Sequence, residues 1–290
     1  YVQRVAADAP LDINAFRWGY AARGRYNSQK LLFFLFGQDK EKPSYVVKLV
    51  RSAGFNARLE REHAVLLRLQ QDSIMPTGTL PETVFFGYHQ GLAILGQTAI
   101  IGAPFELRTS YSADCPYAHA AIRWLIDLSA KTGHDADKSI VDQLQTMVDR
   151  FNELYQPADD QQAFLHAQVE ILRQNPPKLV CQHGDPGSWN LLITPDDRVA
   201  FLDWENASFR ALPLWDLLYF LRSLSVAAGH HKENLGNFDS FDHYFLQESP
   251  LSPLISDSVA RYVAQIGLDP QSVQPLFYLC WVFWAVKQAA

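Results

Sequence analysis

Short apolar, aromatic or β-branched runs occupy the first hundred residues, and turn residues separate them. One helical segment interrupts the runs: residues 57–70 place Leu59, Glu62, Leu66 and Leu69 on one face. Each of the other apolar runs has the length and β-branched or aromatic content of a strand. These predicted strands are residues 14–20, 30–37, 44–50, 83–90 and 92–101. We therefore expect the order strand, strand, strand, helix, strand, strand.

After residue 104 the apolar residues recur every three to four positions, which predicts helices. Three of them are expected at 117–130, 141–154 and 163–173, and the third ends before Pro176-Pro177. Short strands follow at 178–182, 191–194 and 199–203, and helices resume at residue 214 and continue to the end. The prediction is an α+β protein with a small β-rich lobe at 1–101, a short hinge near Gln97–Pro104, and a larger, mainly helical lobe at 102–290 with a small hairpin inside it.

Composition excludes several classes of protein. Hydrophobic residues make up 48% of the 290 residues, which indicates a globular chain. The longest apolar runs, Leu31–Phe36 and Leu276–Val286, are shorter than the roughly 20 residues of a membrane-spanning helix. No signal peptide is visible. The chain starts at Tyr1 and ends in a helix-like run, which suggests either a trimmed chain or a domain cut from a longer chain, whose other domains are then possible partners.

The three cysteines are far apart and odd in number, which argues against a disulfide framework and fits the cytoplasm. The net charge of -6 disfavours nucleic acid as a partner. The charge is uneven: up to Ile101 there are 12 basic and 8 acidic residues, and from Gly102 onward there are 13 and 23. The two regions are therefore expected to face different ligands.

A group of polar residues lies in the segment KLVCQHGDPGSWNLLITPDDRVAFLDWENA, residues 178–207. His183-Gly184-Asp185 is followed five residues after the Asp by Asn190, and Asp203-Trp204-Glu205 comes at the end of a predicted strand. Phosphoryl transfer needs a carboxylate that accepts the attacking hydroxyl's proton, oxygen ligands for Mg²⁺ and a cation on the nucleotide phosphates. In protein kinases these parts follow a fixed order, and this chain has the same order.

The pattern H-G-D-x-x-x-x-N…D-W-E, with P-x-x-D after it, resembles the aminoglycoside phosphotransferase and choline kinase group of small-molecule kinases. The resemblance implies a bilobal, protein-kinase-like fold that uses ATP and Mg²⁺. Asp216 follows Asp203 by only 13 positions, which leaves no room for a protein-kinase activation loop. A small molecule is therefore favoured over a protein as the acceptor.

The resemblance also implies a role for individual residues. Asp185 matches the catalytic base, and Asn190 and Asp203 match the magnesium ligands. Lys48, in the middle of a predicted strand, matches the lysine on the α- and β-phosphates. The other nucleotide-site residues are its ion-pair partner Glu62, Ser28 in the first hairpin, and Gln97 and Ala99 in the linker 97–102 whose backbone holds the adenine. The first hairpin departs from the family pattern because it lacks a full G-x-G-x-x-G.

Several alternatives stay open at this point. Glu60 competes with Glu62 for Lys48, and the buried helix face favours Glu62. His183 is expected to orient the loop and not to act as a base. Glu205 binds a second magnesium ion or its water, contacts a cationic substrate, or is a structural residue. The chain itself is a kinase for a hydroxyl of an amino sugar, sugar or amino alcohol, a catalytically silent nucleotide-binding domain, or a nucleotidyl transferase.

Overall fold

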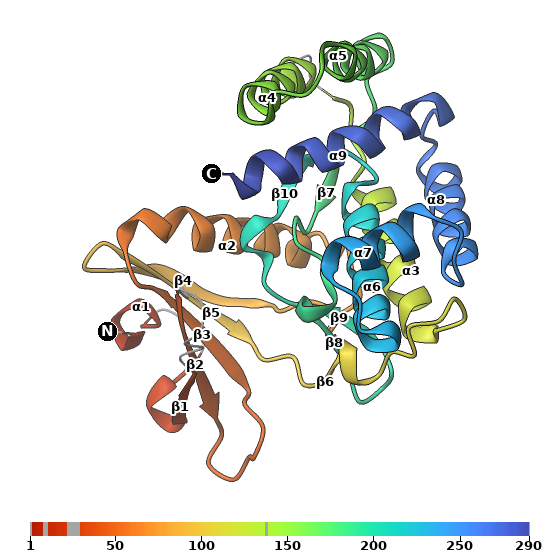
Figure 1. Ribbon diagram of the computed structural model, residues 1–290. Helices are drawn as coiled ribbons and strands as arrows, with labels where there is room; N and C mark the ends of the chain where they lie inside the picture. Colours follow the sequence, from red (N-terminus) through yellow and green to blue (C-terminus); the bar gives the residue numbers. More distant parts are fainter. Residues whose placement is uncertain (1, 8–10, 22–29, 137–138, 290) are drawn as a thin grey trace. The chain divides into compact units, whose positions relative to one another are not determined.

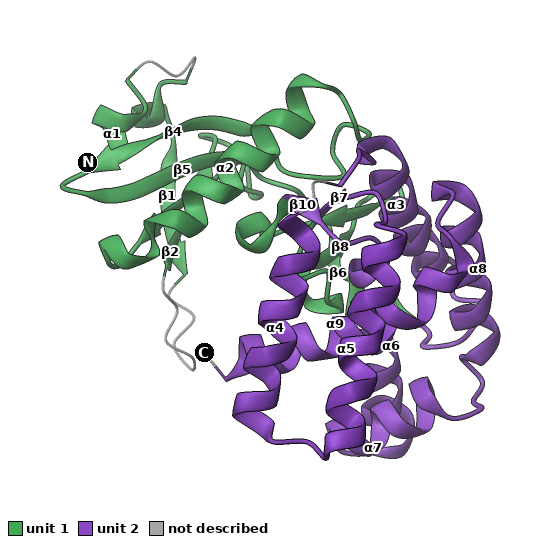
Figure 2. Cartoon of the chain, turned by 90° about the horizontal axis from the view of Figure 1, so that it is seen from above, with its two compact units in different colours: residues 1–109, 183–208 green, residues 110–182, 209–290 purple. Residues whose placement is uncertain are grey.

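The structure is a computed structural model that describes residues 2–7, 11–21, 30–136 and 139–289. The chain forms two compact units, coloured separately in Figure 2. Unit 1 consists of residues 1–109 and 183–208, and unit 2 of residues 110–182 and 209–290. The segment 183–208, which carries the His-Gly-Asp and Asp-Trp-Glu sequences, thus belongs to unit 1. The predicted boundary between 101 and 102 stays a prediction.

Unit 1 is built on a five-stranded antiparallel sheet in the order β1-β2-β3-β5-β4 (Figure 1). The strands are β1 (Arg17–Ala21), β2 (Lys30–Phe36), β3 (Tyr45–Val50), β4 (Thr83–His89) and β5 (Leu92–Thr98). A short helix, α1 (Val2–Val5), precedes them, and α2 (Asn56–Gln71) connects β3 to β4. The two antiparallel strand pairs, the third strand and the helix predicted from the sequence are all present. The predicted turn between the first two strands lies outside the described residues.

Side-chain alternation on β3 decides which residues face α2. Val47 belongs to an apolar cluster with Leu35, Phe85 and Ile94, whereas Val50 packs with Leu59 of α2. Because successive side chains of a strand point to opposite faces, Lys48 shares the face of Val50. Lys48 pairs with Leu32 of β2 and Leu95 of β5, so it lies on the middle strand of the sheet.

The helix α2 buries the face predicted from its sequence. Leu59, Glu62, Leu66 and Leu69 are all at most 1% exposed. A glutamate in an apolar stripe costs free energy unless it is paired. Glu62, which is buried between leucines, therefore requires a partner of opposite charge.

The segment 183–208 folds around a second, smaller sheet in unit 1. Its strands are β6 (Ala103–Pro104), β8 (Leu191–Ile193) and β9 (Val199–Phe201), in the order β6-β8-β9. β8 and β9 pair antiparallel, with Leu191 opposite Phe201. The predicted hairpin is therefore present, and its turn at 194–198 brings the residues after Phe201 back beside Asn190.

Unit 2 is mainly helical (Figure 1). Its helices are α3 (Pro116–Thr132), α4 (Ser139–Tyr155), α5 (Asp159–Gln174), α6 (Trp215–Glu233), α7 (Asn237–Phe241), α8 (Ser252–Ile266) and α9 (Val273–Gln288), and its short strand β7 (Val180–Gln182) pairs with β10 (Ser208–Ala211). The mixed α+β class, with an antiparallel sheet in the N-terminal part and mostly helices in the C-terminal part, is confirmed.

Two further observations bear on the class of protein. Among the described residues, no helix has both the length and the apolar character that would span a membrane. Cys115, Cys181 and Cys280 are all buried, and none of them is in a disulfide.

Candidate functional site

Lys48 and Glu62 form a buried ion pair in unit 1. Lys48 Nζ lies 2.5 Å from Glu62 Oε1 and 3.3 Å from an oxygen of the Asp203 carboxylate. Glu62 Oε1 also accepts hydrogen bonds from Gln97 Nε2 at 3.0 Å and from the backbone N–H of Trp204 at 3.3 Å. The lysine predicted to bind phosphate is thus joined to both the α2 glutamate and the Asp-Trp-Glu segment.

The competing glutamate, Glu60, lies elsewhere on α2. Its carboxylate accepts a hydrogen bond from the hydroxyl of Tyr88 at 2.6 Å, at an exposed position. The buried helix face therefore identified the glutamate that pairs with Lys48.

Neighbouring charges keep Lys48 and Asp203 in their charged forms. Burial acts to lower the pKa of Lys48, but the carboxylates of Glu62 and Asp203 outweigh it and hold that pKa well above its ordinary value. Burial likewise acts to raise the pKa of Asp203. The ammonium groups of Lys48 and Lys30 outweigh this effect, so the Asp203 pKa lies well below its usual range. Asp203 is therefore an anion at neutral pH, as a cation ligand must be.

Asp185 and Asn190 are held together by hydrogen bonds within their loop. Asn190 Nδ2 donates to the backbone oxygen of Asp185 at 2.9 Å and to its Oδ2 at 3.1 Å. The N–H of Leu202 donates to the backbone oxygen of Asn190 at 2.8 Å, which ties the residue before Asp203 to the same loop. The hairpin β8–β9 thus brings the chain before Asp203 back beside the loop of Asp185 and Asn190.

His183 connects the two parts of this segment. It is fully buried, its Nε2 lies 2.8 Å from the carbonyl oxygen of Leu202, and its Nδ1 accepts the N–H of Asp185 at 3.3 Å. This arrangement requires a neutral ring with the proton on Nε2. Burial lowers the pKa of His183 to about 4, so the ring is neutral at pH 7. Orienting the loop, the role expected of this residue, agrees with these bonds.

The buried neutral His183 makes stability depend on pH. Between its ordinary pKa of 6.5 and its folded pKa of about 4, only the unfolded chain binds the proton, so stability falls as the pH decreases through this window. From pH 8 to pH 5 this residue is expected to remove about 2 kcal/mol from the free energy of unfolding. Urea unfolding at both pH values measures it.

Two variants separate His183 from the other titrating groups. His183→Asn retains a donor and an acceptor but no titrating ring, so it should lose less stability between pH 8 and pH 5 than the wild type. His230→Asn changes an exposed histidine and should keep the wild-type dependence. Equal pH dependence in all three proteins would contradict the assignment.

The backbone around the site adopts left-handed conformations at two points. Asp203 has φ +66°, a conformation that non-glycine residues rarely adopt and that is found preferentially at functional sites. Gly184 has φ +77°, and a Cβ atom placed on it would lie 2.2 Å from the carbonyl oxygen of Asn206. Glycine is therefore required at position 184 for two independent reasons.

Gly184→Ala is expected to destabilise unit 1 more than Gly91→Ala does. Both glycines have φ +77°, but a Cβ atom on Gly91 meets no atom within 4 Å. Gly91→Ala should cost about 1 kcal/mol for the left-handed backbone alone, whereas the clash with Asn206 should add a further ~1–3 kcal/mol to Gly184→Ala. Urea unfolding of the two variants measures the difference, and equal losses would contradict this prediction.

The donor atoms at residues 190 and 203 fit a magnesium ion. Carboxylate and amide oxygens are the hard ligands that Mg²⁺ prefers, and its other positions are usually filled by phosphate and water. The Asp203 carboxylate contacts the ammonium groups of Lys30 and Lys48, with which a metal ion would share its oxygen atoms. Within the described ranges, no group of three or more His, Cys, Asp and Glu side chains could hold a metal ion.

The predicted adenine linker lies partly in β5. Gln97 is 2% exposed and its side chain is directed to Glu62, so it contributes to the ion-pair cluster. Ala99 donates its N–H to the backbone oxygen of Ser44 at 2.9 Å, which leaves its carbonyl as the group to offer a nucleotide. Ile100 and Gly102 border a cavity of about 540 Å³ in unit 1. Ser28 lies outside the described residues.

Three further charged residues belong to this site. The sequence did not single out Lys30 and Arg58, and it left the role of Glu205 open. Lys30 Nζ contacts the carboxylate of Asp203 and lies 2.8 Å from Glu205 Oε2. Arg58 Nη1 lies 3.3 Å from Glu205 Oε1. Sequence spacing gave no signal for Lys30, because its partners are more than 170 positions away. Glu205 therefore pairs with protein cations from β2 and α2.

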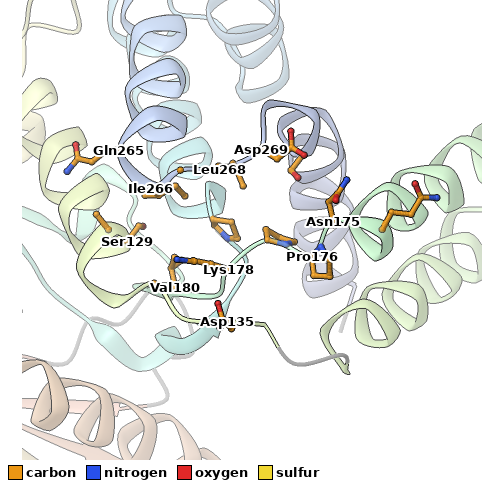
Figure 3. Close-up of a pocket in the computed structure, with 17 residues that line it drawn as sticks. Ser129, Asp135, Asn175, Pro176, Lys178, Val180, Gln265, Ile266, Leu268 and Asp269 are labelled. Carbon is orange, nitrogen blue, oxygen red and sulfur yellow. The ribbon is translucent and has the colours of Figure 1, made fainter.

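A separate cavity of about 510 Å³ lies in unit 2 (Figure 3). It is bordered by the ends of α3, α5 and α8 and by polar side chains that include Asp135, Lys178 and Asp269. None of the predicted catalytic, metal or nucleotide residues lines this cavity. The predicted site residues that the structure describes all lie in unit 1.

Comparison with known proteins identifies the class. A family model described as a phosphotransferase enzyme family matches residues 28–232, which is more than two thirds of the chain. The chain therefore belongs to the phosphotransferase enzyme family, and the resemblance predicted from its motifs is confirmed. Among proteins with curated functions, no sequence matches it.

Solved structures show the same fold at low sequence identity. Aminoglycoside phosphotransferase APH(3'')-Id from Streptomyces rimosus ATCC10970, in complex with ADP and streptomycin, is 17% identical, with 96% of this chain and 95% of that chain covered and a TM-score of 0.56. The aminoglycoside-3'-phosphotransferase of type VIII is 20% identical, with 93% and 94% covered and a TM-score of 0.53. Macrolide 2'-phosphotransferase MphH from Brachybacterium faecium is 14% identical, with 100% and 93% covered and a TM-score of 0.53. These matches establish the kinase-like fold.

Proposed function

We propose that this phosphotransferase transfers the γ-phosphoryl group of ATP to a hydroxyl group of a small molecule. The observation that carries the proposal is the position of Lys48 Nζ, which contacts both Glu62 at 2.5 Å and Asp203 at 3.3 Å. A lysine fixed between a helix glutamate and a metal-binding aspartate is the arrangement that kinases use on nucleotide phosphates. Membership of the phosphotransferase family supports the same reaction class.

In this proposal Asp185 accepts the proton of the acceptor hydroxyl. The transition state of phosphoryl transfer is loose, so the proton leaves late and a carboxylate of ordinary basicity is sufficient. The hydrogen bond from Asn190 Nδ2 holds Asp185 Oδ2 in place, and His183 positions the loop from the other side through the N–H of Asp185. The geometry of the base thus depends on residues that do not touch the acceptor.

Asn190 and Asp203 would hold magnesium, and the ion would supply charge neutralisation on the β- and γ-phosphates. Lys48 binds the α- and β-phosphates. The linker 97–102 binds the adenine through backbone groups. The N–H of Ala99 bonds to Ser44, so the carbonyl of Ala99 is the group proposed to contact the adenine. Ser28 in the first hairpin is proposed to contact the phosphates. ADP in a protein of the same fold is in line with an adenine nucleotide.

For the acceptor, the charge distribution supports a cationic or polyhydroxyl compound. Residues 102–290, the proposed catalytic and substrate-binding lobe, carry 13 basic and 23 acidic residues. A negatively charged region raises the local concentration of cationic ligands. We therefore propose amino sugars, sugars and amino alcohols as the acceptor class.

A panel of these compounds tests the proposal. ATP consumption by the wild type is compared with that of Asp185→Asn, and the product is identified by mass. A gain of one phosphate supports the proposal. A gain of AMP would show nucleotidyl transfer, and binding of MgATP without turnover on any acceptor would show a silent nucleotide-binding domain; either result would overturn the proposed reaction.

A further inference from the structure

Lys30 lies at the start of β2, on the same sheet face as Lys48. Lys30 pairs with Val50, and Leu32 pairs with Lys48. Because strand side chains alternate, residues 30 and 32 of β2 and residues 48 and 50 of β3 all point to one face. Two lysines from neighbouring strands therefore project toward α2 and the Asp-Trp-Glu segment.

The two lysines meet at one atom. Asp203 Oδ1 accepts both Lys30 Nζ and Lys48 Nζ. The side chain of Lys30 is only 16% exposed, so it is largely removed from water. Like charges brought together in this way repel each other unless an anion separates them. The Asp203 carboxylate is that anion.

Glu205 anchors Lys30 on its other side. Its Oε2 lies 2.8 Å from Lys30 Nζ and its Oε1 lies 3.3 Å from Arg58 Nη1, while its backbone oxygen accepts Arg61 Nη1 at 3.1 Å. Both carboxylate oxygens of Glu205 thus contact cations of the protein. This arrangement favours a structural role for Glu205 over a contact with a cationic substrate.

The charges around the two lysines indicate which kind of ligand they would bind. Lys30, Lys48 and Arg58 form ion pairs with three carboxylates, those of Glu62, Asp203 and Glu205, and Arg61 adds a fourth positive charge at the backbone oxygen of Glu205. A divalent cation on Asp203 would add two positive charges and take away the anion that the two lysines share. A polyphosphate, which brings several oxygen acceptors and negative charges, would compensate these positive charges.

We propose that Lys30 is a second phosphate-binding lysine, which Asp203 and Glu205 hold in place until a nucleotide brings its phosphates. Glu205 is then a positioning residue, which acts through Lys30 and Arg58. The inference rests on the proposed function, because it assigns a further residue to the nucleotide phosphates. It extends that function by naming a lysine outside the motifs and a role for the glutamate of Asp-Trp-Glu.

Calorimetric titration with MgATP and with adenosine tests the proposal by binding alone. Lys30→Met should lower the affinity for MgATP by about tenfold or more, the loss expected for one charge-assisted hydrogen bond. It should leave the affinity for adenosine unchanged. Lys30→Arg keeps the charge and should restore most of the MgATP affinity. Glu205→Gln should weaken MgATP by less than Lys30→Met, because the lysine is still present but less well held.

Lys40→Met is the matched control, because Lys40 is an exposed lysine in the turn after the same strand. It should bind both ligands as the wild type does. Thermal unfolding of Lys30→Met without ligand checks that the variant is folded. Equal losses for MgATP and adenosine would show a purely structural role for Lys30, and no loss for either would show that it makes no phosphate contact; both results overturn the proposal.

The outcome also separates this inference from the proposed function. Selective loss of MgATP binding in Lys30→Met, together with no phosphorylated product from any acceptor, would support the phosphate role and contradict the phosphotransfer. A phosphorylated product with unaltered MgATP binding in Lys30→Met would contradict the phosphate role alone. Absence of MgATP binding by the wild type would overturn both.

Discussion

Asp185→Asn is expected to lower turnover by a factor of about 10²–10⁴, the usual contribution of a positioned general base. The substitution keeps the shape of the side chain and removes its ability to accept the hydroxyl proton. Affinity for MgATP should stay within about twofold, because Lys48, Asn190 and Asp203 carry the proposed nucleotide and metal contacts. Initial rates with the best acceptor of the panel, and calorimetric titration with MgATP, measure the two effects.

Asp39→Asn provides the control for this variant. Asp39 is an exposed aspartate in the turn between β2 and β3, so its substitution should leave both turnover and binding unchanged. Near-wild-type turnover in Asp185→Asn would remove Asp185 from the role of base. A parallel fall in MgATP affinity would instead indicate that the substitution disturbs the loop held by Asn190 and His183.

Breaking the Lys48–Glu62 pair is expected to have the second largest effect. Glu62 is 0% exposed and Lys48 is 6% exposed, so either partner alone would be a buried charge with lost compensation. Each single variant, Lys48→Met or Glu62→Leu, should lower the free energy of unfolding by about 3–5 kcal/mol. In Glu62→Leu, the Gln97 amide and the Trp204 N–H also lose their acceptor.

A double-mutant cycle isolates the pair from the rest of its surroundings. Lys48→Met with Glu62→Leu should cost less than the sum of the single variants by about 1–3 kcal/mol, because the second substitution removes the charge that the first left unpaired. The exposed pair Arg150–Glu153 on α4, 2.8 Å apart, is the control and should show a coupling below about 1 kcal/mol. Strict additivity at residues 48 and 62 would refute a buried, energetically coupled pair.

The elements of unit 1 were predictable because each follows from local chemistry. The β-branched run around Lys48 forms a central strand, and the leucine spacing of α2 places Glu62 on the buried face. Glu60, on the same helix, pairs instead with Tyr88 at the surface. The helical spacing of the leucines, with no other information, thus distinguished two glutamates only two residues apart.

Other contacts required the tertiary structure. Gln97 was predicted as part of the adenine linker, and the structure shows that its side chain bonds to Glu62. Whether a side chain at a strand end faces a ligand or the core depends on the strand's register, which the sequence of one strand does not specify. For the same reason, the sequence left three roles for Glu205 open, and only the tertiary structure shows its cationic neighbours on β2 and α2.

The sequence by itself determined the family and the order of the catalytic elements, because phosphoryl transfer needs particular residue types at fixed spacings around short turns. His183, Asp185, Asn190 and Asp203 lie within 21 positions, so local hairpin geometry is enough to bring them together. Only the tertiary structure decided that Lys30 and Arg58 join them. These contacts span more than 140 positions, and they arise because strand register and helix packing place distant charges at one point.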